Sequence, residues 1–374
     1  MEERTDQLRE AIRRPLRFDY HPLYRFYDGG SLTRAFRGLS EGKDDYWSED
    51  WVGSCTCANN TDPSGASQGL SSIDLPGVGP ISLKDLVEAL PEEMVGASFA
   101  ERWGSITGVL VKLLSPKGPV PCHAHPTRAW AQRHLGSRFG KTEAWIFLDT
   151  PGDGTEPAYA GIGFKPGIDR AWFAKAVNRH DNFAIRGSLH RIDVHPGEVY
   201  VAHAGLPHYL GPRLSFIEVQ EPSDHIVIAE TSGDDDAGAT MDLGWDVALD
   251  MIDYTGRDAA ATFAGARQQP RVLRASHGSR EVRLMNEDVL QFFDATALEV
   301  SDEIEVADGR FSIAIVSAGD GSLSGDFGSL AISRGDTFAL PANLAIRVHA
   351  GREPVRIVRC LGPSWRGEDD SCPA

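Results

Sequence analysis

The sequence is poor in long apolar runs and in positive charge, and each shortage excludes a class of protein. No run approaches the roughly 18 apolar residues that a membrane-spanning helix needs. The charged start, MEERTDQLREAIRR, lacks the apolar segment of a secretion signal, so we expect none. Lys and Arg number 37 against 54 Asp and Glu, which gives a net charge of −17. Such a surface repels nucleic acid and anionic lipid, so we expect neither as a partner.

Cysteine is also scarce. The five cysteines are an odd number and lack the spacing of a disulfide framework. Unpaired thiols are usual in the reducing cytoplasm, where we expect the protein to reside. Cys55 and Cys57 are separated by one residue, whereas metal-binding and redox pairs have two, so we expect no function for them.

Short apolar segments bounded by Gly, Pro and Asp dominate the chain. Examples are WIFLDTPGDG, LSFIEVQEP and VRIVRCLGP. Such segments are typical of antiparallel sandwiches and barrels, so the predicted fold is mainly β. Helical periodicity is confined to three stretches, SLKDLVEALPEEMVG, GIDRAWFAKAVNRHDN and DLGWDVALDMIDY, the first with Ser82 as its predicted cap. The last ten residues, WRGEDDSCPA, are predicted to be a mobile tail.

The chain contains an internal repeat. PGEVYVAHAGLPHYLG at 196–211 resembles RGDTFALPANLAIRVHAG at 334–351, and an apolar segment ending in Gly-Asp-Gly precedes each copy. The first copy is longer between these two motifs and includes the amphipathic segment DRAWFAKAVNRH. The simplest architecture is two related β-barrels, the first with helical insertions.

Alignment of the two copies compares side chains at the same fold position. It puts Glu143 opposite Arg310 and His208 opposite Ile346. Metal-competent side chains therefore occupy these positions only in the first copy, and the fold alone does not require them.

The segment VPCHAHP at 120–126 places two histidines one residue apart. Side chains at i and i+2 of a strand point to the same face, so His123 and His125 are predicted to project together. Glu143 opens the next strand and His208 closes a later hairpin. Imidazoles and a carboxylate from neighbouring strands make a site for a borderline divalent metal. The alternative is two loop histidines, a solvated acid and a turn residue.

Four motifs in order, CHAHP, GKTEAW, HPGEVYVAHAGLPHYLG and FIEVQEPSD, resemble those of the type I mannose-6-phosphate isomerases. The resemblance is clearest from about residue 105 to 225. It implies two cupin (jelly-roll β-barrel) domains, at 1–230 and 276–374, joined by a helical connector at 231–275. The second domain would lack metal ligands.

The resemblance also implies roles for individual residues. His123, His125, Glu143 and His208 would bind a divalent metal, for which zinc is the most suitable and manganese, iron, cobalt or nickel also fit. Lys141 and Glu218 would be catalytic, and either could carry the proton between C1 and C2 of a sugar. The alternatives are a solvated strand end for Lys141 and an acid paired with a nearby cation for Glu218.

Two positions depart from the family pattern. His123 stands where the family usually has Gln, and a shell of three His and one Glu resembles cupins that act on non-phosphorylated sugars. Ile228 stands where an arginine usually follows the Ser-Asp pair. A guanidinium that could hold an anion is thus replaced by hydrocarbon.

The predicted function is metal-dependent aldose–ketose isomerisation of mannose 6-phosphate, or of a related sugar such as mannose or lyxose. Two alternatives remain open at this point: a cupin dioxygenase, and a sugar-binding cupin without catalysis. The pairing of Lys141 with Glu143 favours the isomerase, because oxygen chemistry has no evident need for that lysine. The sequence carries no interface signature, so it leaves the oligomeric state open.

Overall fold

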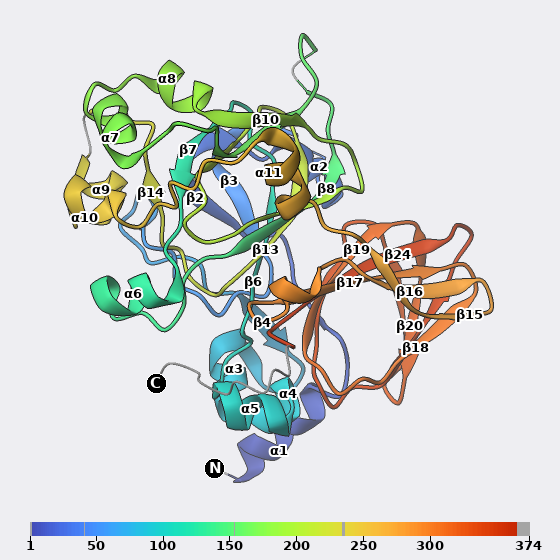
Figure 1. Ribbon diagram of the computed structural model, residues 1–374. Coiled ribbons are helices and arrows are strands. Elements are labelled where there is room, and N and C mark those ends of the chain that lie inside the picture. The colour runs from blue at the N-terminus through green and yellow to red at the C-terminus, as the bar shows by residue number, and fades with distance from the viewer. Residues whose placement is uncertain (1, 41, 153, 234–235, 365–374) are drawn as a thin grey trace.

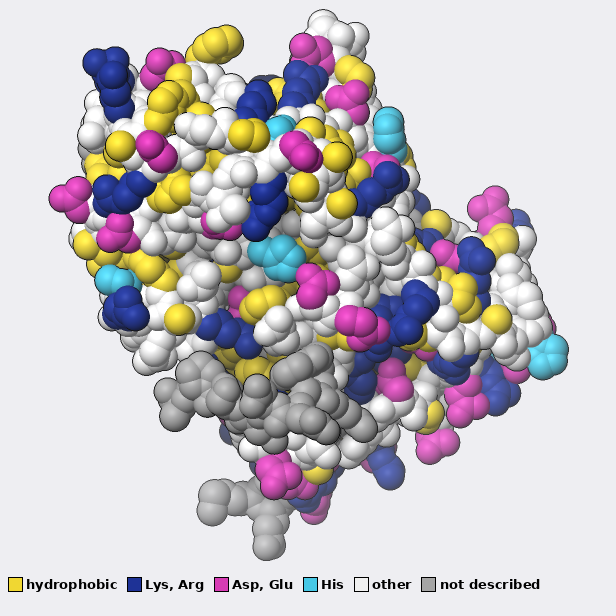
Figure 2. All heavy atoms as spheres, in the orientation of Figure 1, with side chains coloured by type: hydrophobic (Ala, Val, Ile, Leu, Met, Phe, Trp, Pro, Cys, Tyr) yellow, Lys and Arg dark blue, Asp and Glu magenta, His cyan; other side chains and the backbone are white. Residues whose placement is uncertain are grey.

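The structure is a computed structural model that describes residues 2–40, 42–152, 154–233 and 236–364 (Figure 1). Two β-barrels make up most of it, and the first carries most of the helices, so the predicted fold class is confirmed. Acidic and basic side chains are interspersed over the visible face of both barrels (Figure 2). Among the residues that the structure describes, no helix is long and apolar enough to cross a membrane.

The first barrel is built from two sheets. The larger has the order β11 (Val199–Ala202), β8 (Glu143–Asp149), β13 (Ser215–Gln220), β6 (Leu110–Leu114), β3 (Asp45–Trp51) and β2 (Pro22–Gly29). The smaller has the order β10 (Leu189–Asp193), β9 (Tyr159–Phe164), β12 (His208–Leu210), β7 (Val120–Ala124) and β14 (Val227–Ile228).

The second barrel repeats this pattern. Its larger sheet has the order β1 (Leu16–Arg17), β22 (Thr337–Leu340), β19 (Ser312–Ala318), β24 (Val355–Leu361), β17 (Asp294–Val300), β16 (Ser279–Arg283) and β15 (Arg271–Ser276). Its smaller sheet has the order β21 (Gly328–Ser333), β20 (Asp320–Gly325), β23 (Ile346–Ala350) and β18 (Glu303–Val306). From β22 to β15 the strands follow the order of β11 to β2, and β21 to β18 follow that of β10 to β7. The sequence repeat is therefore a repeat of topology.

Strand register corrects one detail of the repeat alignment. Glu143 pairs with Ala202 at the end of β11, and Ser312 pairs with Leu340 at the end of β22. Ser312, not Arg310, therefore matches Glu143. The Gly-Asp-Gly motif follows β19 directly but comes later after β8, so aligning the motifs displaced the strands. The match of His208 with Ile346 holds, because each residue opens its strand.

The two barrels pack their larger sheets against each other. One apolar cluster joins Val111, Ile146 and Ile217 of the first barrel to Ile313 and Val358 of the second. Alternate residues of the same strands fill the barrel interiors, as separate clusters. Strands β6 and β13 are thus buried on both faces, and every residue in them is buried. A polar residue in either strand consequently lies inside the protein.

Helices surround the first barrel and the base of the molecule (Figure 1). They are α1 (Glu2–Ala11), α2 (Ser31–Phe36), α3 (Leu83–Ala89), α4 (Pro91–Val95), α5 (Ala97–Trp103), α6 (Arg128–Leu135), α7 (Arg170–Asn178), α8 (Asn182–Gly187), α9 (Asp236–Ala239), α10 (Trp245–Leu249) and α11 (Ala259–Ala266). A two-stranded hairpin, β4 (Ser72–Leu75) and β5 (Gly79–Ser82), precedes α3. The Ser82 hydroxyl accepts the Asp85 amide at 2.9 Å, which confirms the predicted cap.

The insertion predicted in the first copy of the repeat is present. Helices α7 and α8 lie between β9 and β10, whereas β20 and β21 follow each other without a helix between them. The domain limits 1–230, 231–275 and 276–374 remain a prediction. The short strand β1 belongs to the sheet of the second barrel, through its pairing with β22. The predicted mobile tail at 365–374 lies outside the described residues.

Candidate metal centre

Strands of both sheets of the first barrel bring the four predicted metal-binding side chains together. His123 lies near the end of β7 and His125 directly follows that strand, whereas Glu143 opens β8 and His208 opens β12. Their imidazole nitrogens and carboxylate oxygen all lie within 4.8 Å of one another. None of the four residues is more than 6% exposed.

Backbone carbonyls orient all three imidazoles. The Nδ1 atom of His123 lies 2.7 Å from the carbonyl oxygen of Pro121, and the Nδ1 atom of His208 lies 2.8 Å from that of Leu206. The Nδ1 atom of His125 lies 2.8 Å from the carbonyl oxygen of His225. A carbonyl oxygen can only accept, so each Nδ1 carries the proton and each Nε2 presents a lone pair. Metal-binding histidines are usually held in this way, with the ring nitrogen that does not bind the metal donating to a carbonyl or carboxylate oxygen.

Glu143 supplies the carboxylate that faces these nitrogens. Its Oε2 lies 3.0 Å from His125 Nε2, and its Oε1 lies 3.2 Å from His208 Nε2. The Trp145 indole donates a 3.0 Å hydrogen bond to Oε1 and fixes the carboxylate. Among the described residues, Glu143 Oε2 and His208 Nε2 find no partner of acceptable hydrogen-bond geometry, although both are buried. A metal ion bound among these side chains would satisfy both atoms.

The protonation states also suit a metal. Burial, helped by the Lys141 charge, lowers the pKa of His125 to about 3. Burial likewise lowers the pKa of His123 well below its usual value. Burial opposes the charge of Glu143, but the Lys141 ammonium and the interactions with His125 and His208 together outweigh burial and hold the pKa of that carboxyl well below its usual value. The imidazoles of His123 and His125 are therefore neutral and the Glu143 carboxyl is ionised near pH 7, which are the metal-binding forms.

Lys141 contacts two of the four predicted metal-binding residues directly. Its Nζ lies 2.8 Å from Glu143 Oε2 and 3.0 Å from His125 Nε2. The residue is only 5% exposed, so it is not a solvated strand end.

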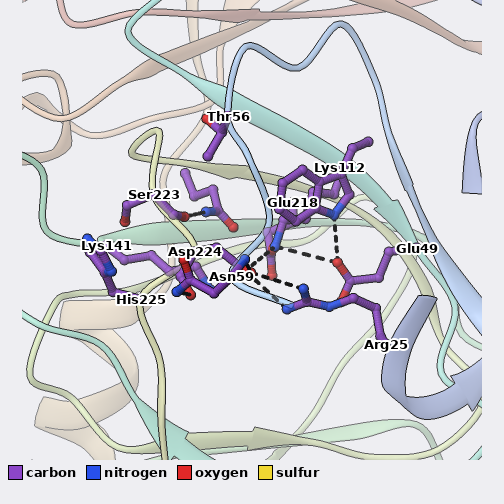
Figure 3. Close-up of polar contacts among 12 residues, drawn as sticks. Arg25, Glu49, Thr56, Asn59, Lys112, Lys141, Glu218, Ser223, Asp224 and His225 are labelled. Carbon is purple, nitrogen blue, oxygen red and sulfur yellow. Dashed lines mark hydrogen bonds and ion pairs between the residues drawn. The ribbon is translucent and has the colours of Figure 1, made fainter. Parts of the chain in front are cut away.

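Glu218 belongs to a second buried group of charges, which Figure 3 shows with Arg25, Glu49, Lys112 and Asp224. Its Oε2 lies 3.2 Å from the Lys112 Nζ, which also lies 3.6 Å from Glu49 Oε2. The Arg25 guanidinium donates two 3.0 Å hydrogen bonds to the two carboxylate oxygens of Asp224. None of these five residues is more than 6% exposed. Glu218 is thus paired with a cation, and the Glu143 carboxylate is near enough to affect its pKa.

The pKa shifts in this group differ in sign. Burial and the nearby Glu143 carboxylate raise the pKa of Glu218, against the opposing effect of Lys112. Burial disfavours the charge of Lys112, but the carboxylates of Glu49 and Glu218 outweigh it and raise the pKa to about 12. Asp224 is buried too, but Arg25 and Lys112 lower its pKa. Glu218 is therefore the carboxyl of this group whose pKa is shifted towards neutral pH.

The sequence reasoning assigned no role to Arg25, Glu49, Lys112 or Asp224. One signal could have revealed Lys112, which stands in the middle of the apolar run LVKLL at 110–114. A lysine inside a fully buried strand must find a partner or lose its charge. Its partners come from distant parts of the chain, which spacing along the sequence does not reveal.

The strand β14 borders the metal cluster on another side. Ile228 pairs directly with His123, so a hydrocarbon side chain lies beside this predicted metal-binding residue. Ile228 and His225 are both partly exposed, in contrast to the buried metal-binding residues.

The fold and the site together define a two-barrel cupin with a buried group of three histidines and one glutamate that is suited to a divalent metal. No family model matches the chain. The curated Bacillus subtilis protein named "Putative mannose-6-phosphate isomerase YvyI" is 26% identical over 276 residues, which is 71% of this chain and 78% of that protein.

Solved structures agree with this relationship. The mannose 6-phosphate isomerase of Bacillus subtilis superimposes with a TM-score of 0.71 at 21% identity, over 92% of this chain and 99% of that one. A zinc-bound mannose 6-phosphate isomerase gives a TM-score of 0.68 at 14% identity, over 94% of this chain and 100% of that one. The predicted resemblance to the mannose-6-phosphate isomerases is thus confirmed in sequence and in fold.

Proposed function

We propose that the protein is a metal-dependent aldose–ketose isomerase that interconverts mannose 6-phosphate and fructose 6-phosphate, or a closely related pair of sugars. The observation that carries the proposal is the orientation of three buried imidazoles by backbone carbonyls, with their Nε2 atoms gathered around Glu143. The curated relative and the solved structures, which are named as isomerases of this kind, support the same substrate class.

His123, His125, Glu143 and His208 would hold the metal, and zinc is our first choice because histidine and carboxylate ligands suit it. The zinc-bound neighbour supports this choice. A bound divalent ion supplies Lewis-acid stabilisation of the negative charge that develops on the sugar oxygens during isomerisation.

We assign the proton transfer between C1 and C2 to Glu218. A shuttling group must both accept and release a proton near neutral pH, and burial raises the pKa of Glu218 in that direction. Lys112 lies 3.2 Å from the Glu218 carboxylate and fixes its position. Lys141 has a different role in this proposal, because its ammonium contacts Glu143 and His125 and so holds two metal-binding side chains in place.

The thiols of Cys122 and Cys360 are unpaired and completely buried in apolar clusters. We propose on this basis that the protein works in the reducing cytoplasm.

The test is conversion of sugars by the zinc-loaded protein. Mannose 6-phosphate, mannose, lyxose and fructose are incubated separately, and the aldose and ketose products are separated and quantified. We expect conversion of mannose 6-phosphate, and loss of at least about 100-fold in kcat in Glu218→Gln. Glu299→Gln, a change at a half-buried strand residue of the second barrel, serves as the control. Failure to convert any of the four sugars contradicts the proposal.

A further inference from the structure

The segment from Asp224 to Ile228 runs beside the metal-bearing strand β7. Ile228 pairs with His123 and Val227 with Ala124. Asp224 turns its carboxylate to Arg25, and it also accepts the backbone amide of Asn59 at 3.0 Å. One short segment thus contacts both the metal cluster and the second group of charges.

His225 occupies the middle of this arrangement. Its backbone carbonyl accepts the hydrogen bond that orients His125. Its side chain lies beside the Lys141 side chain in Figure 3, on the opposite side of Asp224 from Arg25 and Lys112. Backbone and side chain therefore have separable tasks, because a substitution of the side chain leaves the carbonyl that His125 needs.

Exposure distinguishes His225 from its surroundings. His125, Lys141 and Asp224 are all buried, whereas His225 and Ile228 are only partly buried. His225 and Ile228 are thus accessible to a small molecule, whereas the charges beside them are buried. Of these two, only His225 can make a hydrogen bond.

We infer that His225 contacts the bound sugar directly and is a specificity-determining residue, its imidazole hydrogen-bonding to a sugar oxygen on the Lys141 side of the site. This inference rests on the proposed function for the identity of the ligand, a hydroxylated aldose or ketose. An imidazole nitrogen pairs well with a hydroxyl group, and the neighbouring Ile228 offers the sugar only van der Waals contact. The rim of this site therefore recognises the sugar through a histidine and an isoleucine.

The experiment compares His225→Asn and His225→Ala with the wild type, all loaded with zinc. Loss of one hydrogen bond to the substrate is expected to raise KM about tenfold in His225→Ala, with kcat within about threefold of wild type. His225→Asn retains a polar amide, so its KM is expected to lie between those of the wild type and His225→Ala. His195→Asn is the matched control, since His195 lies in an exposed turn after β10. Bound zinc per chain is measured in every variant and is expected to stay unchanged.

Calorimetry supplies a readout that is independent of turnover. The probe is sorbitol 6-phosphate, which has no carbonyl group and so cannot isomerise. We expect His225→Ala to bind it about tenfold more weakly than the wild type and His195→Asn to bind it equally well.

The outcomes separate the inference from the proposed function. Unchanged KM and unchanged probe affinity in His225→Ala overturn the inference, and so does loss of zinc, which would mean that the side chain serves the metal. A wild type that binds the probe but converts no sugar contradicts only the proposed function, and weaker binding by His225→Ala still supports the inference. A wild type that does not bind the probe contradicts both.

Discussion

His123 and His208 stand directly opposite each other in the register between β7 and β12. In the second barrel the corresponding strands, β18 and β23, pair Val306 with Ile346 at this place. Both apolar residues are at most 4% exposed, and the two histidines at most 6%. The barrel fold therefore requires only that this cross-strand pair be buried. Imidazoles occupy this cross-strand pair only in the first barrel, so a chemical role, and not the fold, accounts for them.

This relationship gives a matched pair of substitutions. Loss of a group that only hydrogen-bonds to a metal ligand weakens metal binding about 10- to 100-fold. His208→Ala removes a predicted ligand itself, so we expect it to weaken zinc binding by more than this. Ile346→Ala is expected to leave zinc binding unchanged and to lower the free energy of unfolding by about 2 to 5 kcal/mol, because it opens a cavity in the second barrel. Zinc per chain and denaturant unfolding measure the two effects. Equal loss of zinc in both variants would contradict the assignment of the site to the first barrel.

The pairing of Lys112 with Glu218 predicts a shift in the pH dependence of activity. The Lys112 ammonium lowers the pKa of Glu218, against burial and Glu143, which raise it. Lys112→Met removes this ammonium and therefore raises the pKa of Glu218 further. A higher pH is then needed to ionise the Glu218 carboxyl. We expect the acidic limb of the kcat profile to move up by about one pH unit or more. Steady-state kinetics from pH 5 to 9 measure this limb.

Lys117→Met is the control for that experiment. Lys117 also pairs with a carboxylate, at 3.1 Å from Asp28, but its side chain is 54% exposed. The pH profile of kcat in Lys117→Met should therefore superimpose on that of the wild type. An acidic limb that stays in place in Lys112→Met would show that Glu218 does not carry the proton.

Much of the fold could be predicted from the sequence because its signals are local. Short apolar segments between turn residues predicted the strands, and the repeat at 196–211 and 334–351 predicted two similar barrels. The same locality explains the error of two residues at Glu143. The motif used for alignment lies in the turn after the strand, and turn length can change without altering the strand itself.

The four predicted metal-binding residues could be found from the sequence. Strand periodicity places His123 beside His125, and sequence motifs identify Glu143 and His208. The backbone carbonyls that orient the imidazoles could not be found from the sequence, because every residue has a carbonyl. Arg25 and Glu49 were missed for another reason. Their partners Asp224 and Lys112 lie far away along the chain, and only the closed barrel brings them together.

The Arg25–Asp224 pair predicts how stability depends on pH. The pKa of Asp224 is lower in the folded protein than its usual 3.8, because Arg25 and Lys112 outweigh burial. The carboxylate therefore contributes stability above about pH 4, and this contribution is lost as the pH falls through its folded value. Asp224→Asn leaves Arg25 buried without its carboxylate, and we expect it to cost about 3 to 5 kcal/mol at pH 7.

Urea unfolding of the wild type and Asp224→Asn at pH 7, 5, 4 and 3 measures this dependence. The difference in unfolding free energy should be largest at pH 7 and should shrink below about pH 4. Asp28→Asn, at an exposed ion pair, should cost less than about 1 kcal/mol at every pH. A difference for Asp224→Asn that is independent of pH would mean that the ionised carboxylate is not what stabilises the fold.

The hydrocarbon at Ile228 predicts how the substrate preference can be changed. Ile228 is partly exposed and pairs with His123, so a longer side chain there can extend over the metal cluster without entering the packed core. In Ile228→Arg the added guanidinium can form charge-assisted hydrogen bonds to a phosphate but gains little from a neutral sugar. We expect the ratio of kcat/KM for mannose 6-phosphate to kcat/KM for mannose to rise about tenfold. Phe183→Arg adds the same charge at a 90% exposed residue of α8, and this control should leave the ratio unchanged. An equal rise in both variants would mean that net charge alone, by attracting phosphate to a protein of net charge −17, sets the preference.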